Sequence, residues 1–188
     1  MFKFIFKLAG WRITHYLPKD LHKCVIVVAP HTSNWDFVYG MGAIKFMNLQ
    51  LRFAIKKEWI RFPLKKLMLS LGALPIDRKA KSKPGEKRSS VDAMVDLFNN
   101  FEQLRLVITP EGTRSRVEKW KTGFYHVAIK ANVPIALGFM DYKKRECGID
   151  KIIYPTGDFA ADMKQIMDFY KNMNAKNPNN FITDKELS

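Results

Sequence analysis

Short apolar runs alternate along the chain with segments whose apolar residues recur at helical spacing. Runs rich in β-branched residues predict strands at 23–29, 51–55, 74–77, 104–108 and 134–139, with a weaker one at 151–154. Helical spacing predicts helices at about 37–47, in the second half of 56–71, and at 89–103, 121–130 and 162–173. This alternation predicts a single α/β domain, with a mixed, mostly parallel sheet flanked by helices.

The N-terminus has a pattern of its own. Residues 1–16 mix aromatic and aliphatic side chains with charged ones, and Lys3 and Lys7 interrupt the uncharged centre that a signal peptide needs. We expect an amphipathic helix over residues 1–16, lying in a membrane interface, followed by the main domain over residues 17–188. Packing of the same apolar face on the protein core is an equally good alternative. The longest uninterrupted apolar stretch, residues 24–30, is far shorter than the roughly 20 residues that span a bilayer.

Charge adds information about partners. With 32 Lys and Arg against 18 Asp and Glu, the formal net charge is +14, which favours nucleic acid, an anionic membrane surface or phosphorylated small molecules. Residues 45–88 alone hold 13 basic and three acidic residues, and they form either a solvated face or a surface that attracts anionic lipid. Cys24 and Cys147 lack metal-ligand spacing and indicate a reducing compartment.

A histidine and an aspartate follow the first of these predicted strands. His31 could take the proton of an attacking hydroxyl, provided that a carboxylate such as Asp36 fixes its tautomer. On one regular helix the two side chains would point about 140° apart, so they can meet only if His31 lies in a turn and Asp36 on the helix that follows. Thr32, Ser33 and Asn34 suit such a turn. Alternatively, Asp36 only caps the helix and His31 is a surface residue.

A second polar segment, residues 111–115, also follows a buried strand, and ligands of open α/β sheets bind at such strand ends. Arg114 offers a fork of donors that can grip a phosphate with two prongs, while Gly112 permits a close approach to the backbone. Taken alone, such a segment is more often a turn that carries a surface ion pair.

Four blocks occur in a fixed order. They are His31-Thr-Ser-Asn-Trp-Asp36; Lys56-Lys57-Glu58 with Leu74-Pro-Ile-Asp-Arg78; Pro110-Glu-Gly-Thr-Arg-Ser115; and Val133-Pro-Ile135. Together they resemble the 1-acyl-glycerol-3-phosphate acyltransferase family, the glycerophospholipid acyltransferases with the HxxxxD motif. Two positions depart from the family pattern: Pro30 replaces the usual Asn before the His, and Thr109 replaces an aromatic residue. The chain is also shorter than typical members, with less N-terminal membrane anchor.

The resemblance implies an acyltransferase-like fold and an enzyme of phospholipid biosynthesis. Such an enzyme moves a fatty acyl group from an acyl thioester to the hydroxyl of a lysophospholipid such as 1-acyl-glycerol-3-phosphate. The resemblance makes His31 the general base and Asp36 its orienting partner. It places the acceptor's phosphate or headgroup at Arg78, Glu111, Gly112, Thr113 and Arg114, with Lys57 as a weaker addition. It implies no metal or cofactor, and the donor would be acyl-CoA or an acyl-carrier protein.

We expect a single displacement by a cytoplasmic protein attached peripherally to the inner face of the cell membrane. Its partners would be a lyso-lipid acceptor, a thioester donor and an anionic membrane surface, but no nucleic acid. The acceptor could also be another lyso-lipid, such as an acylated amino acid. A basic nucleic-acid-binding protein is a rival, although the sequence lacks zinc, helix-turn-helix and ribonucleoprotein motifs. A serine hydrolase that uses Ser33 or Ser115 is another, although no Gly-x-Ser-x-Gly elbow is present.

Overall fold

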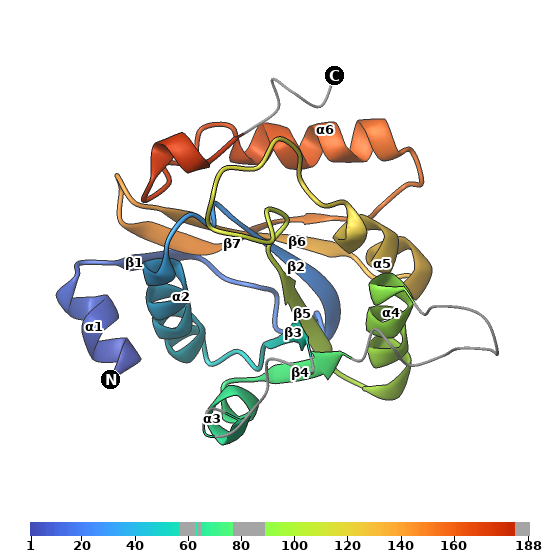
Figure 1. Ribbon diagram of the computed structural model, residues 1–188, viewed down its shortest axis with the longest axis horizontal. Helices are drawn as coiled ribbons and strands as arrows, with labels where there is room; N and C mark the ends of the chain where they lie inside the picture. Colours follow the sequence, from blue (N-terminus) through green and yellow to red (C-terminus); the bar gives the residue numbers. More distant parts are fainter. Residues whose placement is uncertain (57–62, 64, 77–88, 183–188) are drawn as a thin grey trace.

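The computed structural model describes residues 1–56, 63, 65–76 and 89–182. Within them, a seven-stranded sheet has the order β1-β7-β6-β2-β5-β3-β4 (Figure 1). The strands are β1 (Arg12–His15), β2 (Lys23–Ala29), β3 (Arg52–Lys56), β4 (Ala73–Ile76), β5 (Leu104–Ile108), β6 (Ile135–Asp141) and β7 (Glu146–Ile153). All neighbouring strands are parallel except β6 and β7. The predicted mixed, mostly parallel sheet is confirmed.

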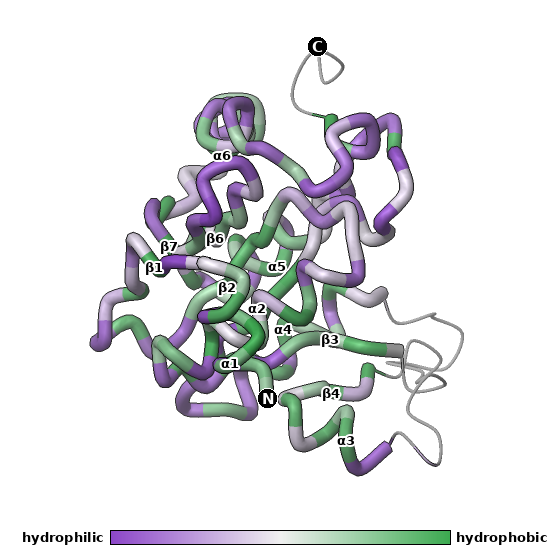
Figure 2. The backbone as a smooth tube through the Cα atoms, turned by 90° about the vertical axis from the view of Figure 1, so that its left-hand side faces the viewer, coloured by the Kyte–Doolittle hydropathy of each residue, from purple (hydrophilic) through white to green (hydrophobic). Residues whose placement is uncertain are grey.

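Helices cover both faces of this sheet. They are α1 (Phe2–Leu8), α2 (Asn34–Met47), α3 (Lys65–Ser70), α4 (Ser90–Asn100), α5 (Gly123–Ala131) and α6 (Phe159–Tyr170), with a short 3-10 helix, η2 (Pro178–Asn180). On β2, Val25 and Val27 join the core formed with α4, α5 and α6, whereas Cys24 and Ile26 point to the other face. There α1 and α2 pack near Met140 of β6. Hydrophobic residues accordingly follow β2 through the middle of the molecule and recur along β3 (Figure 2).

Two strands depart from the sequence prediction by more than two residues. β2 and β5 have the predicted bounds, but β7 is far longer than the weak strand predicted at 151–154. The strand was not predicted over its full length because two exposed charged residues, Asp150 and Lys151, interrupt its apolar pattern. β1 was not predicted at all: it is a short edge strand with mostly exposed side chains.

The predicted helix over residues 1–16 is wrong beyond Leu8. α1 ends there, Gly10 takes a φ of +71° that favours glycine, and β1 then pairs with β7. One face of α1 packs on the core, as the alternative interpretation held: Phe6 is 3% exposed, and a Cβ at Gly42 of α2 would lie 2.6 Å from its Cβ. The opposite face leaves Phe4 exposed. No helix among the described residues is both long and apolar enough to cross a bilayer.

The three central strands bring distant parts of the chain to one edge of the sheet. β5, β2 and β6 are parallel neighbours, with Val27 paired to Ile108 and Ala29 to Phe139. Their carboxyl ends therefore lie side by side, at the kind of edge where open α/β sheets bind ligands. The residues that follow these ends build the site.

Candidate active site

The turn after β2 is organised by Ser33. Its Oγ accepts the backbone N–H of Trp35 at 3.2 Å, and its own backbone N–H donates to Asp36 Oδ2 at 2.8 Å. This capping box places Asp36 in the first turn of α2 and leaves His31 ahead of the helix. His31 Nδ1 lies 3.5 Å from Asp36 Oδ2, so the turn and the helix bring the two side chains together. Asp36 thus caps the helix and faces the histidine at the same time.

Burial sets the charge of His31. The side chain of His31 is 16% exposed and that of Asp36 only 3%. Desolvation lowers the pKa of His31, Asp36 opposes this shift, and the positive charge of Arg114 adds to it. The imidazole is therefore neutral at neutral pH. A proton on Nδ1, facing the carboxylate, leaves the lone pair of Nε2 free, which is the state that a general base requires.

The second oxygen of Asp36 is held from the end of β6. Tyr142, the first residue after that strand, donates its hydroxyl to Asp36 Oδ1 at 2.5 Å. Desolvation, together with this bond, raises the pKa of Tyr142 well above its ordinary value, so the hydroxyl remains a donor. Sequence reasoning missed Tyr142. Its position directly after a strand that ends at the same edge was the available signal.

Glu111 occupies a different place from the one that the resemblance implied. Its side chain is 1% exposed, and Oε1 accepts the backbone N–H of His31 at 2.9 Å. Oε2 is buried without a hydrogen-bond partner among the described residues. Desolvation raises the pKa of this carboxyl to about 7. Glu111 thus lies beneath the His31 turn, and its carboxyl does not face solvent as a headgroup ligand would.

The rest of the loop after β5 is exposed. Gly112 has a φ of +64°, and a Cβ there would lie 2.6 Å from Lys121 Nζ, so both backbone conformation and space favour glycine. Thr113 and Arg114 follow it on the surface. Arg114 forms no ion pair with any described residue, and its charge is close enough to lower the pKa of His31. Within the described part of the chain, this exposed cation is thus placed where its charge can act on an anion beside the histidine.

The C-terminal segment also supports the site. The backbone N–H of Asn177 donates to Thr32 Oγ1 at 3.1 Å, and its side-chain amide donates to the Thr32 carbonyl at 2.7 Å. This contact was missed in the sequence. Two residues predicted to bind the acceptor, Lys57 and Arg78, lie outside the described residues. The described part of the chain places no group of three or more His, Cys, Asp or Glu residues where they could hold a metal ion.

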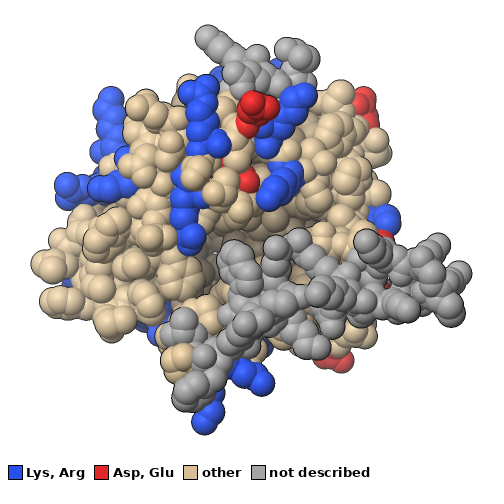
Figure 3. Space-filling view, viewed as in Figure 1, with Lys and Arg blue, Asp and Glu red and all other residues tan. Residues whose placement is uncertain are grey.

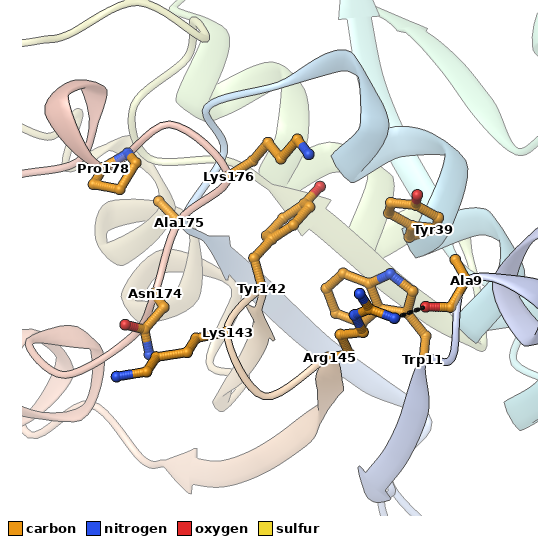
Figure 4. Close-up of a pocket in the computed structure, with 10 residues that line it drawn as sticks. All are labelled: Ala9, Trp11, Tyr39, Tyr142, Lys143, Arg145, Asn174, Ala175, Lys176 and Pro178. Carbon is orange, nitrogen blue, oxygen red and sulfur yellow. Dashed lines mark hydrogen bonds between the residues drawn. The ribbon is translucent and has the colours of Figure 1, made fainter.

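A hollow of about 500 Å³ lies beside Tyr142. Aromatic and cationic side chains make up most of its wall: Trp11, Tyr39, Tyr142, Lys143, Arg145 and Lys176 (Figure 4). No acidic side chain lines it among the described residues. On the molecular face of Figure 3, Lys and Arg side chains outnumber Asp and Glu over the upper half, above a hollowed centre. This surface favours an anionic ligand.

Known proteins share this site's segments. An acyltransferase family model matches residues 12–136. The 1-acyl-sn-glycerol-3-phosphate acyltransferase of Salmonella typhimurium is 33% identical over 144 residues, which cover 72% of this chain and 55% of that protein. Proteins of the same name from Escherichia coli (31%, 72% and 55%) and Haemophilus influenzae (29%, 70% and 54%) are similar too.

The matched part contains the turn after β2 and the loop after β5, and it ends before Tyr142. The chain spans little more than half the length of these curated relatives. The family model covers most of the chain itself. The chain belongs to the acyltransferase family.

Proposed function

We propose that this protein is an O-acyltransferase of phospholipid biosynthesis, which moves a fatty acyl group from an acyl thioester to the hydroxyl of a lysophospholipid. The observation that carries the proposal is the buried His31, held against Asp36 at the sheet edge, with the charge of Arg114, which forms no ion pair among the described residues, close enough to act on it. The names of the relatives support 1-acyl-glycerol-3-phosphate as the acceptor.

The reaction is a single displacement with His31 as the base. Nε2 removes the proton of the acceptor hydroxyl while its oxygen bonds to the thioester carbonyl carbon. The tetrahedral intermediate then loses its C–S bond, and the imidazolium returns the proton to the departing thiolate. Asp36 stabilises the imidazolium between these steps, as a triad carboxylate does. One acylated lipid and one free thiol leave the site.

Acceptor binding centres on Arg114. A guanidinium binds phosphate through two parallel hydrogen bonds, and Arg114 is exposed and unpaired among the described residues. Gly112 and Thr113 accompany it as surface residues of the same loop. We assign Glu111 to the support of the His31 turn, since its carboxyl is buried there. Lys57 and Arg78 keep the acceptor role that the family resemblance gives them.

The donor is acyl-CoA or an acyl-carrier protein. Both carriers are phosphate-bearing anions, which the cations around the hollow, Lys143, Arg145 and Lys176, would attract. The protein is cytoplasmic and attaches peripherally to the inner face of the cell membrane. The exposed side of α1 and the basic residues of 45–88 provide the two attachment signals, because neither a short amphipathic helix nor surface charge suffices alone.

Transfer assays with the purified protein test this function. Acyl-CoA and acyl-carrier protein are each incubated with 1-acyl-glycerol-3-phosphate or with an acylated amino acid. Mass spectrometry follows the acylated lipid, and a thiol reagent follows the released carrier. We expect one diacyl product per free thiol with the phosphate acceptor. Thiol release without an acylated lipid would indicate a hydrolase, which a fluorophosphonate probe would then label. The absence of both products would overturn the proposal.

A further inference from the structure

Tyr142 belongs to none of the four sequence blocks and lies outside the residues that match the family model. We propose that Tyr142 is a positioning residue: its hydroxyl fixes the rotation of the Asp36 carboxylate, so that Oδ2 faces His31. The expected effect of Tyr142 on turnover rests on the proposed function. Its expected effect on the His31 ring rests on geometry alone.

The two oxygens of Asp36 have different tasks. Oδ2 accepts the Ser33 N–H at 2.8 Å and faces His31 Nδ1 at 3.5 Å, while Oδ1 accepts the Tyr142 hydroxyl. The contact with His31 is already longer than a strong hydrogen bond, so a small tilt of the carboxylate would lose it. Without a donor at Oδ1, the Ser33 N–H would be the one remaining hydrogen-bond restraint on this rotation among the described residues. Tyr142 is thus the second restraint that aligns the pair.

The ring of Tyr142 is itself fixed. Its backbone N–H donates to the carbonyl of Asn174 at 2.8 Å, and its ring lies edge-on to that of Trp11, with centroids 5.0 Å apart. Lys176 Nζ lies 5.7 Å from the ring centroid. Asp141, which precedes Tyr142 in the chain, is the last residue of β6 and is buried. A ring held by these contacts can aim a hydroxyl more accurately than a free surface tyrosine could.

The test replaces Tyr142 with Phe, which keeps the ring and removes only the donor. We expect kcat to fall about tenfold, the worth of one hydrogen bond to a charged group, while KM for both substrates stays unchanged. In an Asp36→Asn background the same change should lower kcat less than about twofold, because the aligned carboxylate is already lost. A purely structural tyrosine would have the same effect in both backgrounds.

Tyr125→Phe is the matched control. Tyr125 donates its hydroxyl to Asp162 at 2.8 Å in a buried tyrosine–carboxylate bond between α5 and α6, whereas His31 and Asp36 belong to the turn after β2 and to α2. Its loss should lower the thermal unfolding midpoint and leave kcat unchanged. Equal losses of kcat in the two Phe variants would overturn the inference, since they would reflect stability alone.

Nitrogen-15 NMR of the His31 ring separates this inference from the proposed function. Measured without substrate, wild-type protein should show the proton on Nδ1, and Tyr142→Phe should shift tautomer population toward Nε2–H. Unchanged His31 signals in Tyr142→Phe would overturn the inference even if acyl transfer is found. If Tyr142→Phe does not fold, 3,5-difluorotyrosine at position 142 changes donor strength with little change of shape. His31 signals that do not respond to this analogue would also overturn it.

Discussion

Two loops at one edge of the sheet are built in opposite ways. The turn after β2 is held by bonds from three other segments: Glu111 accepts the His31 N–H, Tyr142 holds Asp36, and Asn177 holds Thr32. The loop after β5 leaves Arg114 exposed and without an ion pair among the described residues. One region is fixed before any ligand arrives, and the other has its donors available.

The difference follows from what each region does. Proton transfer depends on geometry within a fraction of an ångström, which justifies several restraints on one turn. Phosphate binding needs a donor whose charge is not already neutralised by a protein carboxylate. Glu111 joins the two regions, because its backbone belongs to the exposed loop while its side chain supports the fixed turn. Predictions that separate turnover from binding can therefore test the comparison.

The largest effect is expected at His31. His31→Ala should lower kcat by about 10² to 10⁴, the usual worth of general-base catalysis, because it removes the base of the proposed reaction. KM for both substrates should change little. Steady-state kinetics measure this, and circular dichroism should show the wild-type fold. A folded variant with near wild-type turnover would remove His31 from the mechanism.

Glu111→Gln should change how stability depends on pH. Burial raises the Glu111 pKa from 4.5 to about 7, so the folded protein holds this proton more tightly than the unfolded chain does. The resulting stability is complete below pH 4.5 and is lost as pH rises through about 7, a total of about 3 kcal/mol. Gln does not titrate. We expect the unfolding free energy of wild type to decline with pH more steeply than that of the variant.

Urea unfolding at a series of pH values measures this difference. His31 contributes in the opposite sense, since its lowered pKa makes the folded protein more stable as pH rises toward 6.5. That contribution is common to both proteins and cancels when the two are subtracted. Parallel stability curves for wild type and Glu111→Gln would mean that Glu111 keeps an ordinary pKa.

Arg114→Lys should act on binding. An ammonium cannot reproduce the two-pronged contact of a guanidinium with phosphate, so the acceptor KM should rise about tenfold. The donor KM and kcat should stay near wild type. Arg116→Lys, two residues further along the same exposed loop, is the matched control. It should leave the acceptor KM, the donor KM and kcat unchanged. An equal rise in the KM of acceptor and donor would assign Arg114 to the fold or to the donor site.

The sequence predicted what is local in this structure. β2 and β5 were found because their apolar runs are continuous, and His31 and Asp36 because they share one turn and one helix cap. Tyr142 contacts Asp36 across 106 residues of chain, and Asn177 contacts Thr32 across 145. No periodic pattern encodes such contacts, since only the sheet order brings those segments together. The buried position of Glu111 escaped prediction for the same reason.

The contrast between fixed and available groups also occurs within α1, where the smallest effect is expected. Phe4 is 70% exposed and Leu8 76%, while Phe6 is 3% exposed. Phe4→Ser with Leu8→Ser should weaken binding to anionic vesicles about fivefold, or roughly 1 kcal/mol, because an interface dehydrates each side chain only partly. Its unfolding free energy should remain that of wild type. Sedimentation with vesicles of stated anionic content measures the binding.

Phe6→Ala sharpens the same comparison from the buried side. Removing a core aromatic ring costs about 3 to 5 kcal/mol, so this change should lower the free energy of unfolding. Truncation of α1 would combine this loss of stability with the loss of vesicle binding. Tyr154→Ser is the control on the exposed side, since Tyr154 is 71% exposed. It follows the last residue of β7, whereas β1, the strand after α1, pairs with the first residues of β7. Vesicle binding that falls equally in Tyr154→Ser, or that ignores added salt, would contradict attachment through α1 and basic residues. Loss of binding in Phe4→Ser with Leu8→Ser alone, with stability intact, assigns the exposed face of α1 to the membrane and its buried face to the core.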